Sequence, residues 1–225
     1  MKKRIPLYAL GVVAMALGIT LLNRSDLGTT PLSSIPYVLS KLLAGQDFFT
    51  FGRLTLLFHS ACILLQVAVC RRVTVQMVLQ FPLAIAFSAL LDLFMSWIVL
   101  PAPALWLRAL LCAAGIALSA LGIVLIVRAG LMLPAPDALL HAVSQRTGRP
   151  LGQGKIVGDV TWVTVAALLS LWHLLSTGTA GLGPLLAGCF GGELAIGVGT
   201  LCAMYFTGRL VGAFKKLPCF AERAA

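Results

Sequence analysis

Long apolar segments alternate with short polar ones along the whole chain. A membrane-spanning helix needs about 20 mostly apolar residues, and six segments meet that requirement. They cover residues 5–23, 53–70, 76–98, 104–127, 155–175 and 195–214. The pattern therefore predicts an all-α polytopic membrane protein with six transmembrane helices.

Two shorter apolar-biased segments, 30–44 and 134–146, are each interrupted by prolines. Both are too short to span a bilayer. Backbone that ends at membrane depth is tolerated only where protein or water satisfies its polar groups. We therefore expect two short half-helices, either interfacial or re-entrant, which do not cross the membrane.

One motif occurs twice, 104 residues apart. Residues 7–27 read LYALGVVAMALGITLLNRSDL and residues 111–131 read LCAAGIALSALGIVLIVRAGL, with ten of 21 positions identical. Arg24 and Arg128 hold the same position in the two copies. Such self-similarity indicates an internal duplication.

The duplication divides one membrane domain, residues 1–225, into repeat 1 at about 5–98 and repeat 2 at about 104–216. Each repeat carries three predicted spans. An odd number of spans reverses the direction of the chain, so we expect an inverted internal repeat. A parallel duplication is the alternative.

The distribution of lysine and arginine between the two sides of the membrane tests the predicted arrangement of six spans. With a cytoplasmic N-terminus and non-crossing half-helices, four of the 17 lysines and arginines lie outside: Arg24, Lys41, Arg53 and Arg108. The others are cytoplasmic, as the positive-inside rule favours. We expect a multi-pass protein of the cell inner (plasma) membrane with both termini cytoplasmic.

The glycine-rich segment 176–196 is expected to form an outer loop or a re-entrant segment.

Composition agrees with a membrane protein, since 60% of residues are apolar, 11% are charged and the mean hydropathy is +1.00. The net charge of +10 does not indicate nucleic-acid binding, because the basic residues lie at the ends of apolar segments. The expected partners are the lipid bilayer and a small solute that the sequence does not identify. A homo-oligomer is compatible with the sequence.

Motifs for metal, cofactor or catalytic chemistry are not found. The six cysteines form no CxxC pair and are interpreted as small apolar side chains. His59, His141 and His173 lack ligand spacing. We therefore expect no metal, no cofactor and no enzymatic activity.

Several segments, in order along the chain, resemble the YczE/YitT-like family of bacterial integral membrane proteins. They are LGTTPLSSIPYVLSKLL (27–43), FTFGRLTLLFHSACILLQ (49–66), QFPLAIAFSALLDL (80–93), MLPAPDALLHAV (132–143), GKIVGDVTWV (154–163) and GVGTLCAMYFTG (197–208). The resemblance implies a polytopic membrane protein. It implies no particular substrate or reaction.

Carboxylates inside apolar segments are candidate site residues, because burying a charge in hydrocarbon is costly. Asp159 lies one helical turn after Lys155, which predicts an i, i+4 ion pair. That pair is either structural or a proton or cation site. Asp92, in the third span, is expected to pair with Arg108 or Arg24, in a structural or a functional role.

The half-helices offer different chemistry in the two copies. Asp137 follows two prolines at the start of the second half-helix, where a carboxylate caps free N–H groups. Alternatively, Asp137 meets a ligand. Ser33 is the equivalent residue in the first copy, beside Thr29 and Thr30, so that half-helix could accept an anionic group.

Further polar residues and glycines have positions that suggest roles. Arg24 and Arg128 end their spans and either snorkel to headgroups or act as symmetric gate residues. Gln80 has a depth similar to that of Asp159, so the two could line one cavity.

Glycines recur every seven residues on one helix face in each copy, which favours close helix packing. They are Gly11, Gly18, Gly115 and Gly122.

These patterns favour a secondary transporter or channel-like permease for a small solute, with a site between inverted repeats. One alternative is a substrate-binding membrane subunit of an ATPase-energised uptake complex. Another is a membrane accessory protein with no transport role.

Overall fold

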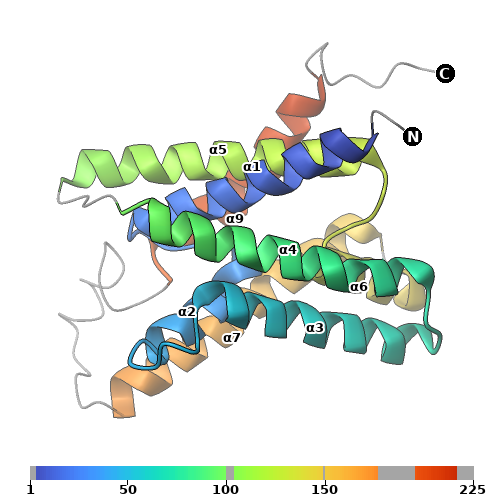
Figure 1. Cartoon of the computed structure of the whole chain (residues 1–225), viewed down its shortest axis with the longest axis horizontal. Helices are drawn as coiled ribbons and strands as arrows, with labels where there is room; N and C mark the ends of the chain where they lie inside the picture. The colour runs from blue at the N-terminus through green and yellow to red at the C-terminus, as the bar shows by residue number, and fades with distance from the viewer. Residues whose placement is uncertain (1–3, 100–103, 149, 177–195, 217–225) are drawn as a thin grey trace.

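Helices make up the computed structural model of the chain (Figure 1). The structure describes residues 4–99, 104–148, 150–176 and 196–216, and within these ranges it holds no strand. The elements are α1 (Arg4–Arg24), η1 (Pro31–Ser33), α2 (Ser34–Leu42), α3 (Phe51–Cys70), α4 (Val75–Trp97), α5 (Leu105–Ala129), α6 (Ala135–Thr147), α7 (Leu151–Ser176) and α9 (Val198–Lys216). The glycine-rich segment, apart from its two ends, lies outside the described residues.

Five described helices are long and apolar enough to cross a membrane: α1, α3, α4, α5 and the Gly152–His173 part of α7. They match five of the six predicted spans. The sixth position is occupied by α9, which is not among these five. Its 19 residues include Arg209, Lys215 and Lys216. The described residues therefore form a multi-pass membrane protein with five candidate spans.

Large apolar side chains cover the outside of these helices. Leu64 on α3 and Trp106 on α5 are each 70% exposed, and Trp172 on α7 is 67% exposed. Soluble proteins rarely expose apolar surface on this scale. These faces are suited to contact with lipid.

The closest helix contact joins α1 and α5, which run antiparallel (Figure 1). A Cβ added to Gly18 would lie 2.5 Å from the Ser119 backbone nitrogen and 2.8 Å from the Gly115 carbonyl oxygen. One added to Gly122 would lie 2.7 Å from the Gly11 oxygen. The predicted glycine face is therefore a backbone-to-backbone contact, which small residues permit.

Short helices occupy both predicted half-helix positions. In the first copy, η1 and α2 cover residues 31–42; in the second, α6 covers 135–147. Each contacts a long helix of its own copy and one of the other copy: α2 packs on α3 and α7, and α6 packs on α7 and α3. The two copies are thus interleaved.

The largest buried apolar cluster lies among α1, α2, α4 and α5. Ile19, Val38, Leu91 and Ile126 are at its centre, each almost fully buried. This packing fixes the end of α1 against the first short helix.

Candidate functional site

A cavity of about 390 Å³ opens between α3, α4, α5 and α6. Its polar lining consists of Gln66, Arg72, Thr74, Gln80, His141 and Gln145, together with Gln76. Among the described residues that line it there is one cation, Arg72, and no carboxylate. We call this space the polar cavity. Its volume lies within the range of small-molecule sites.

Two buried glutamines form the inner wall of the polar cavity. The Gln66 side-chain nitrogen donates to Gln80 Oε1 at 3.1 Å and to the Ala135 carbonyl oxygen at 3.0 Å. Both glutamine side chains are almost fully buried. Because Ala135 is the first residue of α6, Gln66 ties α3, α4 and α6 together. Buried amides such as these need partners, and their remaining donor and acceptor positions suit a polar ligand or water.

A smaller inner pocket shares Gln80 and Ile126 with the polar cavity. Its volume of about 20 Å³ has room for one water molecule. The Tyr8 hydroxyl, which is buried, has no hydrogen-bond partner among the described residues. His59 also lines the pocket and stacks on Phe87, with ring centroids 5.7 Å apart. Sequence reasoning missed Tyr8, whose only signal was a lone phenol in an apolar span.

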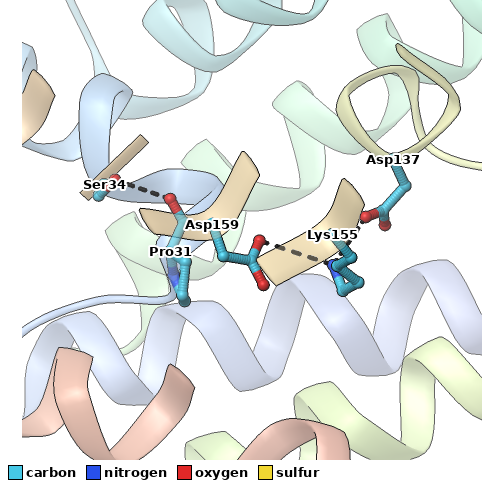
Figure 2. Close-up of polar contacts among 5 residues, drawn as sticks. All are labelled: Pro31, Ser34, Asp137, Lys155 and Asp159. Atoms are coloured by element: carbon cyan, nitrogen blue, oxygen red, sulfur yellow. Dashed lines mark hydrogen bonds and ion pairs between the residues drawn. The ribbon is translucent and has the colours of Figure 1, made fainter. Parts of the chain in front are cut away.

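A second polar cluster joins α6 and α7 (Figure 2). Lys155 Nζ lies 2.8 Å from Asp137 Oδ1 and 3.7 Å from Asp159 Oδ1. The predicted pair of Lys155 and Asp159 is confirmed. Asp137 lies in the first turn of α6, as the sequence predicted. Its carboxylate also accepts a hydrogen bond from Lys155, a partner that was not predicted. Whether Asp137 caps the helix or meets a ligand stays a prediction.

Asp159 does not line the polar cavity, so the expected shared cavity with Gln80 is wrong. Ala138 and His141 on α6 face the polar cavity. Leu139 and Leu140 face α7 from another side of the same helix. The helix α6 therefore separates the ion cluster of α7 from the buried glutamines.

Asp92 holds the start of α3. Its Oδ1 accepts from the Gly52 backbone N–H at 2.7 Å, and its Oδ2 accepts from the Thr50 hydroxyl at 2.7 Å. These donors take the place of the expected partners Arg108 or Arg24. A carboxylate at a helix N-terminus is favoured by unpaired N–H groups and by the helix dipole.

This geometry predicts a structural role for Asp92. Asp92→Ala should destabilise the protein by about 1–3 kcal/mol, because the buried Gly52 N–H loses its acceptor. Asp92→Asn should cost less, since the amide oxygen still accepts that hydrogen bond. Thermal unfolding of the purified variants measures both. Equal losses from the two substitutions would contradict this interpretation.

The two equivalent arginines have different environments. Arg24 is half-buried and donates to the carbonyl oxygen of Met95 near the end of α4, whereas Arg128 is exposed. Ser33 is buried at the start of α2. Among the eight residues proposed from the sequence, Gln80 is the one that lines the polar cavity.

Polar groups are also sealed at the end of α1. Both side-chain amide atoms of Asn23 and the hydroxyls of Thr29 and Thr30 are buried and have no partner among the described residues. The Ser34 hydroxyl donates to the Pro31 carbonyl oxygen at 2.7 Å (Figure 2).

Tyr37 closes this region from α2. Its hydroxyl donates to the Asn23 carbonyl oxygen at 3.2 Å. Burial, assisted by the charge of Asp26, raises the pKa of the Tyr37 phenol, so it stays a neutral donor.

A family model described as a family of unknown function, DUF6198, matches residues 2–216. Its description does not name the YczE/YitT-like family that the sequence motifs resemble. No curated protein and no solved structure matches the chain.

Proposed function

The chain belongs to the family of unknown function DUF6198, and from its geometry we propose that it is a secondary transporter or permease for a small polar solute. The polar cavity carries this proposal. It lies between helices of both copies, α3 and α4 from the first and α5 and α6 from the second. Binding at a repeat interface is common among secondary transporters.

The inverted repeat of three spans each is part of the proposal, with α9 as the last span. Its support is the reciprocal contact of α1 and α5. Gly11 meets Gly122, and Gly18 meets Gly115. Gly115 is equivalent to Gly11, and Gly122 is equivalent to Gly18, by the 104-residue shift. Exchanging the two copies therefore exchanges the two glycine pairs, as a two-fold relation between the copies requires.

The cavity lining indicates the class of solute. Amide and imidazole groups donate and accept hydrogen bonds without a fixed charge, and carboxylates to hold a cation are not among the described lining residues. Arg72, the one cation of the described lining, is an exposed residue, whereas the buried lining residues Gln66 and Gln80 carry no charge. We therefore propose an uncharged, hydrogen-bonding solute. By the positive-inside rule the mouth beside Arg72 faces the cytoplasm.

Gln80→Leu tests this function. Flux in proteoliposomes is measured over a panel of radiolabelled polyols, sugars, amino-acid amides and nucleobases. We expect wild-type flux of at least one solute and a loss of about tenfold or more in Gln80→Leu, because a site built to hydrogen-bond its ligand discriminates strongly when the partner is missing.

Gln153→Leu is the matched control, because Gln153 is exposed on α7 and away from the polar cavity. Its flux should equal that of the wild type. No flux of any panel solute from folded wild-type protein, or equal flux in both variants, would count against the proposal.

A further inference from the structure

The residues of α5, of α6 and of the segment between them that line the polar cavity have counterparts in the first copy. Subtracting 104 converts Val127 to Asn23, Leu133 to Thr29 and His141 to Tyr37. The same positions that border an open cavity in the second copy therefore occupy the end of α1 and the first short helix.

Most of these counterparts are sealed. Val127 is 42% exposed, whereas Asn23 is 2% exposed. Of the ten counterparts, Asp26 is exposed and Lys41 is half-buried, and the others are buried. Six of the buried ones are at most 5% exposed: Leu22, Asn23, Thr29, Ser34, Tyr37 and Val38. Buried polar groups are normally hydrogen-bonded, whereas the amide of Asn23 and the hydroxyl of Thr29 have no partner among the residues that the structure describes.

The start of α9 closes this region. Gly199 N–H donates to the Leu27 carbonyl oxygen at 2.8 Å, and Thr29 N–H donates to Thr200 Oγ1 at 3.0 Å. The backbone of Gly28 has a φ of 137°, and an added Cβ there would overlap Thr200 Oγ1. Only glycine suits so close an approach at this φ.

We propose that residues 22–41 form a second access cavity for the same uncharged solute, closed in this structure by Gly199 and Thr200. The inference rests on the proposed transport function. Opening this cavity gives Asn23 and Thr29 hydrogen-bond partners, as water or solute enters. Because the repeats are inverted, it opens on the membrane face opposite to the polar cavity, and the two alternate.

Matched cysteine substitutions test the alternation. Thr29→Cys and Leu133→Cys place a thiol at the same position in each copy. Right-side-out and inside-out membrane vesicles are treated with an impermeant maleimide, and the native cysteines are distinguished by peptide mass spectrometry. We expect the thiol at position 133 to react from one face and the thiol at position 29 to be protected.

Thr200→Val in each background removes the oxygen that accepts the Thr29 N–H. We expect labelling at position 29 to rise about fivefold, the effect of losing one hydrogen bond, from the face opposite to that of position 133. Labelling at position 133 should fall in parallel. Thr200→Ser keeps the hydroxyl and should label like the parent, which controls for the substitution itself.

Continued protection of position 29 in Thr200→Val would overturn the inference. So would a rise at position 29 with no fall at position 133, since that describes local loosening. Reciprocal labelling without flux of any panel solute would support the two cavities and overturn the transport function instead.

Discussion

Gly18→Leu is expected to abolish the folded protein. An added Cβ already lies 2.5 Å from the Ser119 backbone nitrogen, and the rest of a leucine side chain has no space to enter. Overpacking of this kind costs about 3 kcal/mol or more, because backbone atoms of α5 must move. The expected result is loss of monodisperse protein after extraction in mild detergent, measured by size-exclusion chromatography.

Gly212→Leu in α9 makes the same change in a helical glycine whose added Cβ would meet no atom of the described residues within 4 Å. Its yield and melting temperature should match those of the wild type. A stable Gly18→Leu protein would show that α1 and α5 do not approach as closely as the structure places them.

Lys155→Met is expected to lower the stability of the folded protein. The substitution removes the cation between Asp137 and Asp159 and keeps the length of the side chain. Breaking a buried ion pair leaves uncompensated charge and costs about 3–5 kcal/mol. The Lys155 side chain is 47% exposed, so solvent screens the pair and about 1–2 kcal/mol is expected. Thermal unfolding in detergent measures this loss.

The triple variant Lys155→Met, Asp137→Asn, Asp159→Asn is the control. It removes the cation and both carboxylate charges together, so most of the lost stability should return. Additive losses from the three substitutions would show that the ion cluster is not one electrostatic unit.

Local patterns in the sequence predicted the helices well. The prolines located both short helices, and the seven-residue glycine spacing marked the helix faces suited to close packing; the structure shows that these two faces meet each other. These signals are local, since they depend on neighbours within one helix. The antiparallel relation of Gly18 and Gly115 also follows from counting spans, although the sixth span is not among the candidate spans of the described residues.

The partners of the carboxylates could not be predicted in the same way. Asp92 accepts a hydrogen bond from a backbone N–H 40 residues away, a donor that every residue except proline possesses. Asp137 pairs with a lysine that also had a suitable partner within its own helix. The partner of each carboxylate depends on which helices are neighbours and on how each helix is rotated. In helices that are apolar on all sides, the sequence carries little information about that rotation.

The polar cavity could not be predicted from the sequence either, because its lining also depends on which helices are neighbours. Gln80 was a candidate because its depth in the third span is similar to that of Asp159 in the fifth. In the inner pocket beside the polar cavity, Tyr8 and His59 gave no comparable signal, because each lies alone in a different helix. These side chains come together only through the packing and rotation of α1, α3 and α4 in the folded protein.

The glycine contact between α1 and α5 also limits the motions available to the repeats. At Gly18 and Gly115 backbone meets backbone, so sliding one helix along the other would force Leu22 into the chain of its partner. Rotation about the crossing keeps this spacing. The contact can therefore act as a pivot between α1 and α5. When one helix rotates about this point relative to the other, its two ends move in opposite directions. A small rotation at the contact gives a larger displacement at the membrane surfaces.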